Sequence, residues 1–444
     1  MHGTLRNFID LKYFYTLIFI LLSPPLWANT ITLEEILDYA TKNAVSLKIK
    51  QTDALIESKN IQSAKAAYYP SLNVVYNAEY NQALDGVPLG VEYVGGLTIS
   101  NETRYQSSIA FQLNYNIYNF GATKKRVNIA SGEFDIKKMQ WCSAEKQLHQ
   151  QILKHYASAN KANIKIKFKT QMLELRKKLY SMKERLYRVG KYSKIDLGDE
   201  AISIISLKRD IDNIAMLYNE DIIKLSQLSH KKITKDVTLL PFNINDKNHF
   251  IQKYDETTEG KILNKKIMQK KDEISMQFRE QFPSLGLYSS YYYYASHPTK
   301  YDYTVSNLNK KSWNIGLSLK YNIFEGFKHS TNKQRLKLEL HRLKQELDVA
   351  KHNYVYEDKS KIIKIKELGI LKKHEQYLLE ENYKKRDMLN RLYEIKKIDS
   401  ITKINAEYEL LERALNIESR DIEIAFERVS LNILHRGVNQ CSQH

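Results

Sequence analysis

The sequence predicts a mostly α-helical α+β protein with two tandem structural repeats, each holding two membrane β-strands and long coiled-coil helices. The first supporting observation is an alternation of apolar and polar residues that occurs in two pairs of stretches. Period two over about ten residues is what a half-buried strand needs, and polar-in, apolar-out strands rich in Tyr are typical of outer-membrane barrels. The second is a heptad spacing of apolar residues along stretches almost free of Gly and Pro, which is typical of coiled coils.

The composition also favours long helices. The 444 residues include only 15 Gly and 7 Pro, and 27% are charged, a balance that suits helices better than compact mixed domains. The formal net charge of +18 could indicate nucleic acid or an anionic surface as a partner. Lys and Glu are interspersed along the helical stretches, however, so we expect solvated helix faces and no nucleic-acid partner.

Residues 1–28 are predicted to be a secretory signal peptide. Arg6 and Lys12 supply positive charge, Tyr13 to Leu22 form an apolar core, and Ala28 is the expected last residue before cleavage. The apolar core is too short for a spanning helix, which needs about 20 residues. The chain is therefore expected to be exported.

The first repeat, residues 29–230, is expected to begin with a helix from Thr30 to Tyr69. Thr32 and Glu35 form a capping box at its start. Pro70 ends it, because the residue before a proline is pushed toward extended geometry.

Two strands are predicted next, at about 71–82 and 106–119, joined by a polar loop that is too long for a tight hairpin. Their shared apolar face consists of Leu72, Val74, Tyr76, Ala78, Tyr80, Ile109, Phe111, Leu113, Tyr115 and Ile117. Gly121 marks the change from strand to helix.

A long helix is predicted from Ala122 to about Val189. Its later part carries a seam with 3-4-3-4-3 spacing: Met172, Leu175, Leu179, Met182, Leu186 and Val189. Such a helix would be about 100 Å long, so it must lie against helices of similar length. A turn at Gly190 to Ser193 leads into a second helix that ends near Ser229.

After a linker at 231–256, the pattern returns in a second repeat, residues 257–437, which a tail at 438–444 follows. Strands are predicted at about 284–295 and 312–325. Their apolar face consists of Leu285, Leu287, Tyr291, Tyr293, Trp313, Ile315, Leu317, Leu319, Tyr321 and Ile323. The run from Tyr291 to Tyr294 is interpreted as an aromatic girdle at a membrane interface, with aromatic residues on both strand faces as the alternative.

The two repeats align at a constant offset of 206 residues, which pairs Tyr115 with Tyr321 and Arg185-Leu186-Tyr187 with Arg391-Leu392-Tyr393. An unbroken register over such a distance indicates an internal duplication. The strand–helix junctions are expected at Pro70, Gly121, Pro283 and Gly326.

Four membrane strands cannot close a barrel alone, and an open sheet edge is not tolerated in lipid. Bacterial barrels begin at about eight strands, so copies of the chain would have to share one: two copies give eight strands and three give twelve. Helices continuing the wall would form a hollow cylinder. The expected product is a conduit, and no enzyme is predicted.

This plan resembles the TolC family of outer-membrane channel proteins. The residues that carry the resemblance are the repeated order of elements, Thr32-Leu33-Glu34-Glu35, Tyr68-Tyr69-Pro70-Ser71-Leu72 and Asn116-Ile117-Tyr118-Asn119-Phe120-Gly121. The resemblance implies a homotrimer with a shared 12-stranded β-barrel in the outer-membrane lipid and a periplasmic α-barrel. It further implies an exit duct for drugs, small molecules or polypeptides. That duct would serve a tripartite efflux pump or type I secretion system, together with a periplasmic adaptor (membrane fusion) protein and an inner-membrane transporter.

The resemblance also places the closable end of the tunnel at two helix–helix turns, 185–200 and 391–406. Tyr393 falls where the family often has a tyrosine in the closing network. Thr402 and Asn405 stand where some members carry pore-narrowing aspartates, while Asp196 and Asp199 are present in the first turn. The constriction is therefore expected to attract cations less than an Asp ring would.

The same turns hold the candidates for adaptor contact. Lys396 and Lys397 replace the Gly-containing turn formed by Gly190 and Lys191 in the first repeat. A solvent-exposed turn without a partner is the alternative.

No metal, cofactor or catalytic motif is predicted from the sequence. Whether Cys142 and Cys441 pair is left open. The main alternative function is a periplasmic or surface coiled-coil protein, structural or adaptor-like, without a pore.

Overall fold

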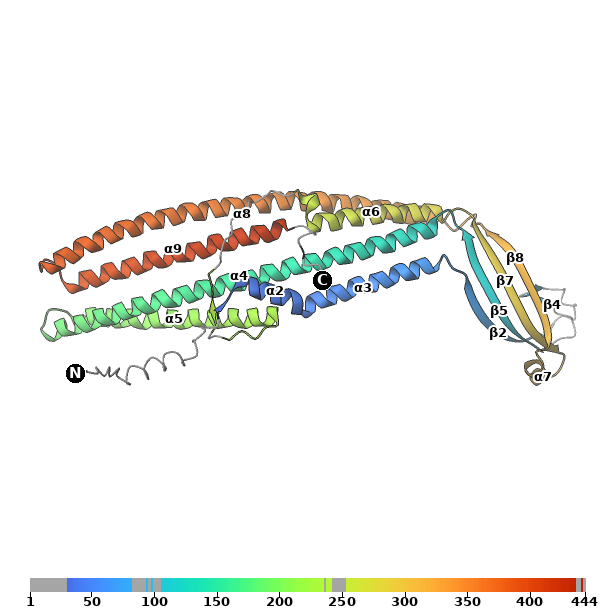
Figure 1. The fold of residues 1–444 in the computed structure, drawn as a ribbon, viewed down its shortest axis with the longest axis horizontal. Helices are drawn as coiled ribbons and strands as arrows, with labels where there is room; N and C mark the ends of the chain where they lie inside the picture. The colour runs from blue at the N-terminus through green and yellow to red at the C-terminus, as the bar shows by residue number, and fades with distance from the viewer. Residues whose placement is uncertain are drawn as a thin grey trace, which may run out of the picture.

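The computed structural model describes residues 30–81, 93–94, 97–98, 105–234, 237–241, 253–436 and 441. The expected signal peptide lies outside the described residues, as do most of the first strand–strand loop and the tail other than Cys441. Long helices run side by side and a small sheet stands at one end of them (Figure 1). The predicted mostly α-helical α+β class, with two strands of the main sheet and long helices in each repeat, is confirmed. No described helix is both long and apolar enough to cross a bilayer.

The two repeats have matching helices. The first contains α2 (Leu33–Asn43), α3 (Val45–Ala66), α4 (Ala122–Arg188) and α5 (Lys194–Ser229), and the second contains α6 (Thr258–Arg279), α8 (Lys328–Glu394) and α9 (Ser400–His435). Helices α4 and α8 have 67 residues each, and α5 and α9 have 36 each. The first and last residues of α8 and α9 lie 206 residues after those of α4 and α5, respectively, so the helix boundaries follow the duplication.

The single helix expected from Thr30 to Tyr69 is wrong, because the chain breaks at Ala44. Half of the predicted capping box is present among the described contacts, since the Glu35 amide donates to Thr32 Oγ1 at 3.1 Å. Ala44, however, has extended geometry, with φ −60° and ψ 120°, and is buried in the core with Leu47. No Gly or Pro signals this break. Tertiary packing overrides an uninterrupted helical pattern here.

Part of the expected linker is structured. The short strand β6 (Thr238–Leu239) pairs in parallel with β1 (Thr30–Ile31), and the 3-10 helix η1 covers Tyr254–Glu256. The described part of the linker thus returns to the strand that directly precedes α2.

The main sheet is antiparallel with the order β2-β5-β7-β8. Its strands are β2 (Ser71–Tyr80), β5 (Tyr105–Tyr118), β7 (Ser284–His297) and β8 (Lys310–Lys320). A short helix, α7 (Tyr301–Ser306), joins β7 to β8, and a separate hairpin is formed by β3 (Tyr93–Val94) and β4 (Leu97–Thr98). Strand β8 ends five residues before the expected end. Asn322 donates to Glu325 in a local turn there, so Tyr321 and Ile323 lie beyond the sheet face to which they were assigned.

The strand register separates an apolar face from a polar one. One row across all four strands consists of Val74, Phe111, Tyr291 and Trp313, and the adjacent row on the other face consists of Asn73, Gln112, Ser290 and Asn314. Tyr291 and Tyr293 lie on the apolar face while Tyr292 and Tyr294 lie on the polar one, so the alternative for the tyrosine run, aromatic residues on both strand faces, is confirmed, and the girdle stays a prediction.

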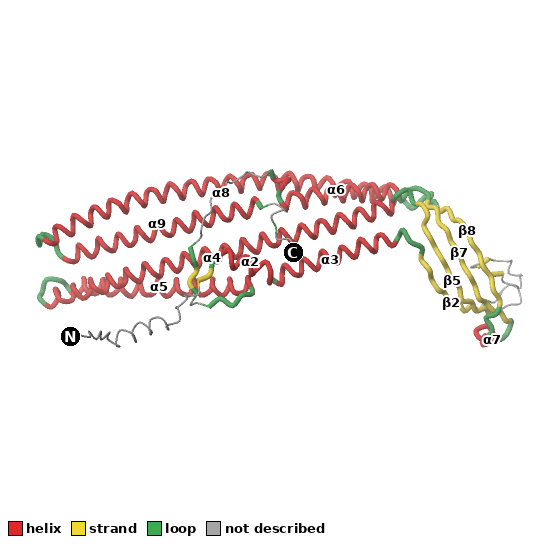
Figure 2. The backbone as a smooth tube through the Cα atoms, viewed as in Figure 1, coloured by secondary structure: helices red, strands yellow, loops and turns green. Residues whose placement is uncertain are grey.

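Helices α4 and α5 form one long antiparallel pair, and α8 and α9 form a second pair beside it (Figure 2). The pairs meet along α4 and α9: Met172 and Leu207 share a buried cluster with Leu411, and Leu179 shares another with Ile401. The predicted seam is confirmed except at its end, where Val189 is 67% exposed.

A disulfide joins Cys142 on α4 to Cys441 near the C-terminus, with their Cα atoms 5.7 Å apart. Glu145 approaches both sulfurs within 4.8 Å. Because the sulfurs are bonded to each other, they are not available as metal ligands. One helical turn further along α4 lies His149, which is buried.

His149 makes this region sensitive to acid. Arg436 donates to Nδ1 at 3.1 Å, so the neutral ring carries its proton on Nε2 and donates it to Thr41 at 2.9 Å. Burial, followed by the Arg436 charge, lowers the pKa of His149 to about 4, although the Glu145 carboxylate at 4.0 Å favours the charged form.

We therefore expect the folded state to lose stability as the pH falls from about 6.5 to about 4, because the unfolded chain binds the proton first. The loss should reach on the order of 3 kcal/mol at the bottom of that window. Unfolding midpoints measured against pH test this, and a His149→Gln variant should show a flatter profile. Equal slopes for the two proteins would contradict it.

Candidate functional site

The two turns at the far end of the helices share one backbone geometry. Gly190 has φ +75°, and Lys396, at the equivalent position, has φ +59°. The amides of Gly190 and Lys396 donate to the carbonyls of Tyr187 and Tyr393, each at 2.9 Å. All four adaptor-contact candidates, Gly190, Lys191, Lys396 and Lys397, are exposed at this end (Figure 1).

The backbone at Lys396 is strained, because a left-handed conformation costs a non-glycine residue about 1 kcal/mol or more. Lys396→Gly is therefore expected to stabilise the protein by roughly 1 kcal/mol, measured as a rise in the unfolding midpoint. The matched variant is Gly190→Ala, which meets no atom within 4 Å and should destabilise through its φ alone. A fall in the midpoint for Lys396→Gly would contradict the argument.

Two of the predicted gate residues, Asp196 and Thr402, take part in the caps of the helices that follow the turns. Ser193 and Asp196 form a capping box at the start of α5, and hydrogen bonds from Ser193 lower the pKa of Asp196. At the start of α9 the roles are reversed: Asp399 is the N-cap and accepts from the Thr402 amide at 2.9 Å and from its hydroxyl at 2.8 Å. These bonds lower the pKa of Asp399.

Asp399 was not singled out from the sequence, although the offset aligns it with the Ser193 cap. The second turn therefore does carry a carboxylate, three residues before Thr402. Asp199 and Asn405, which the same offset aligns, are both exposed.

Tyr393 is held within its own helix pair. Ser400 Oγ donates to its hydroxyl at 3.2 Å, and Lys403 Nζ lies 5.3 Å from its ring centroid. Among the described contacts, none joins Tyr393 to α4 or α5.

In the described part of the chain, two cationic side chains of α4 reach the opposite pair: Lys161 binds Glu423 on α9, and Arg176 lies nearer the turns. Its guanidinium lies 3.4 Å from Glu200 on α5 and 4.4 Å above the Tyr408 ring on α9.

Glu200 is 3% exposed and also binds Lys183 at 2.9 Å. The sequence offers one signal for this site: the duplication fails there, because Glu200 aligns with Ala406.

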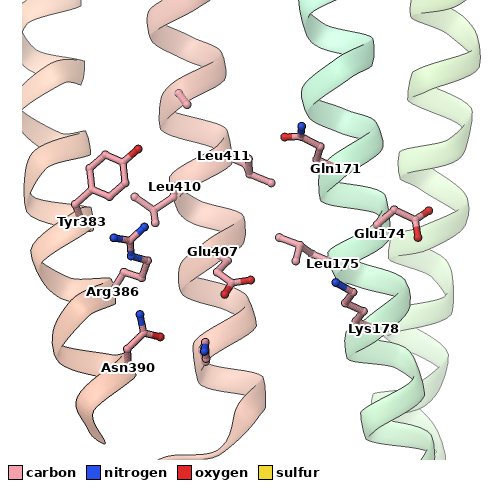
Figure 3. A pocket seen from close by; sticks show the side chains of 12 residues that line it. Gln171, Glu174, Leu175, Lys178, Tyr383, Arg386, Asn390, Glu407, Leu410 and Leu411 are labelled. Carbon is pink, nitrogen blue, oxygen red and sulfur yellow. The ribbon is translucent and has the colours of Figure 1, made fainter. Parts of the chain in front are cut away.

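A groove of about 580 Å³ lies beside this link, between α4 and the α8–α9 pair (Figure 3). Its apolar side chains include Leu175 from α4 and Leu410 from α9, and its charges include Lys178 and Arg386.

At the other end of the helices, the strand–helix junctions repeat a pair of left-handed residues. They are Phe120 and Gly121 in the first repeat, with φ +53° and +79°, and Gly326 and Phe327 in the second, with φ +59° and +64°. Glycine thus occupies the second position of one junction and the first of the other. Pro70 and Pro283 directly precede β2 and β7, as expected.

Residues 43–227 match the sequence family described as "Outer membrane efflux protein". Among curated proteins, no sequence matches the chain significantly.

Solved structures match over nearly the whole chain. The Campylobacter jejuni CmeC outer membrane channel is 14% identical with a TM-score of 0.76, covering 93% of this chain and 86% of that one. The Vibrio cholerae outer membrane protein VceC is 12% identical with a TM-score of 0.73, covering 91% and 96%. The open-state MtrE outer membrane channel of Neisseria gonorrhoeae is 15% identical with a TM-score of 0.68, covering 94% and 93%. At these identities the structures establish a shared fold.

Proposed function

We propose that three copies of this chain form an outer-membrane exit duct, which the family match over residues 43–227 and the shared fold support. Their sheets would close a 12-stranded barrel, and their helices would continue it as a periplasmic tunnel. The observation that carries this is a four-stranded sheet with one apolar face, two open edges and helices of 67 residues running from it.

The strand directions allow closure between copies. Strands β2 and β7 run away from the helices, and β5 and β8 run back toward them. The edge strand β8 of one copy would therefore meet β2 of the next in antiparallel fashion, as closed membrane barrels require. The apolar side chains on these edges are open, with Leu72 68% and Trp313 70% exposed.

The helices also leave apolar side chains uncovered. On α5, Ile202 is 67% exposed, and on α8, Leu338 is 70% exposed. Large apolar patches on a single copy are typical of interaction surfaces, and neighbouring copies would cover them in a ring.

Fractionation tests the assembly. We expect a heat-modifiable trimer in outer-membrane extracts, and discrete conductance steps after the purified protein is added to a planar bilayer. A soluble periplasmic monomer without conductance would favour the alternative, a coiled-coil structural or adaptor protein.

The exposed turns would meet the periplasmic adaptor, which links the duct to an inner-membrane transporter. Charge reversal at Lys396 and Lys397 should weaken capture of the cognate adaptor in a pull-down, while reversal at the exposed Lys359, in the middle of α8, should not. Undiminished capture would leave these lysines as a solvated turn. The duct would act passively, in efflux or in type I secretion.

Asp196, Asp199 and Asp399 give the proposed constriction its carboxylates, and Thr402 and Asn405 its neutral groups. We expect weak block by divalent cations in single-channel recordings, because Asp399 is already engaged by Thr402. Tight block that disappears on mutating Thr402 or Asn405 would contradict this.

A further inference from the structure

The polar face of the sheet is nearly free of charge. Although 27% of the chain is charged, the described polar-face positions of β2, β5, β7 and β8 carry charges only at strand ends, at Glu79, Lys310 and Lys320. Amides, hydroxyls and tyrosines occupy most of the rest. In the row formed by Asn73, Gln112, Ser290 and Asn314, every strand contributes an uncharged hydrogen-bonding group.

Tyr288 adds an aromatic surface to this face. It lies opposite Gly316 in the register and is 41% exposed. A Cβ at Gly316 would stand 2.5 Å from the Tyr288 hydroxyl oxygen and 2.6 Å from Cζ, so the ring lies across the glycine, along the wall. Asn114 is its register partner on β5. The result is a tyrosine held flat beside an amide.

This chemistry suits one kind of solute. Charged pore walls concentrate counter-ions and impose ion selectivity. The middle of the polar sheet face carries no charged side chain among the described residues, so we expect it to do neither. Neutral donors and acceptors can replace the water around an uncharged polar solute, and an aromatic ring can pack against the apolar face of a sugar ring.

We infer that the barrel lumen binds and passes uncharged polyhydroxylated solutes of the oligosaccharide class, with Tyr288 as the stacking surface. The inference rests on the proposed function, which makes the polar face the inside of the barrel. It adds a substrate class that neither the fold nor the net charge of +18 indicates.

The test uses the full-length trimer in a planar bilayer, with maltohexaose added on the barrel side. We expect transient current block. Tyr288→Ala should weaken the apparent affinity about three- to tenfold, and Gly316→Ala should also weaken it, because the new methyl group displaces the ring without removing a polar group. Tyr291→Ala, on the lipid-facing side, is the matched control and should leave the block unchanged.

The outcomes separate the two proposals. Absence of any conductance from the wild-type trimer overturns the duct itself. Conductance with no maltohexaose block, with a block that polyethylene glycol of similar size reproduces, or with a block that Tyr288→Ala leaves unchanged overturns the lumen inference alone. Heat-modifiable migration of each variant shows that its barrel has assembled.

Discussion

Replacing Arg176 by Met is expected to open the helical tip and to raise single-channel conductance several-fold. Arg176 lies on α4. Its guanidinium contacts Glu200 on α5, the other helix of its pair, and the Tyr408 ring on α9, which belongs to the opposite pair. Its removal leaves the buried Glu200 carboxylate with Lys183 alone and frees α9 from the cation–π contact.

The size of the effect follows from the contact that crosses between the two helix pairs. The Arg176–Glu200 ion pair joins α4 to α5 and is present whether or not the pairs separate, so its loss lowers stability without favouring the open arrangement. The cation–π contact with Tyr408 does cross between the pairs and is worth about 1 kcal/mol, which corresponds to roughly a fivefold shift between closed and open arrangements.

Arg188→Met is the matched control. Arg188 lies on the same helix, is 72% exposed and pairs only with Glu184 among its described contacts, so its loss should leave conductance unchanged. Tyr408→Leu should raise conductance as Arg176→Met does, because it removes the same contact between the pairs, and it should cost less stability, because Arg176 still binds Glu200. An assembled Arg176→Met trimer with wild-type conductance would show that this link does not hold the tip.

The regular parts of the fold could be predicted because two independent patterns agree on them. Period-two alternation places Val74, Phe111 and Trp313 on one face, and the strand register bears this out. The 206-residue offset carries helix boundaries from one repeat to the other, since equivalent turns such as those at Gly190 and Lys396 impose equivalent ends.

The features that escaped prediction depend on contacts between distant segments. Nothing local breaks the helix at Ala44, where burial in the core prevails. The sequence around Glu200 predicts a solvated carboxylate. In the fold, Glu200 is buried and binds Arg176 and Lys183 of α4. The resemblance indicates Thr402 and Asn405, and it does not indicate Asp399. Its capping role follows from its alignment with Ser193 instead.

The disulfide between Cys142 and Cys441 could not be predicted either, because the two residues are 299 positions apart in the sequence and this separation does not give their distance in space. Its consequence for stability is large. A cross-link over so long a loop should restrict the unfolded chain strongly, and removal of a native disulfide typically costs 2–5 kcal/mol. We expect Cys142→Ser/Cys441→Ser to lose a comparable amount.

The double variant also separates the disulfide from the loss of two buried side chains. Cys142 is 2% exposed and packs 3.5 Å from the Thr258 hydroxyl, a contact that a serine hydroxyl can replace. Reductant should therefore lower the wild-type unfolding midpoint at a fixed scan rate and leave that of the double variant unchanged. Thiol labelling would first show that both cysteines are reduced. If the wild-type unfolding midpoint then did not change with reductant, the neighbouring contact between Arg436 and His149 would be sufficient to hold the C-terminal segment without the disulfide.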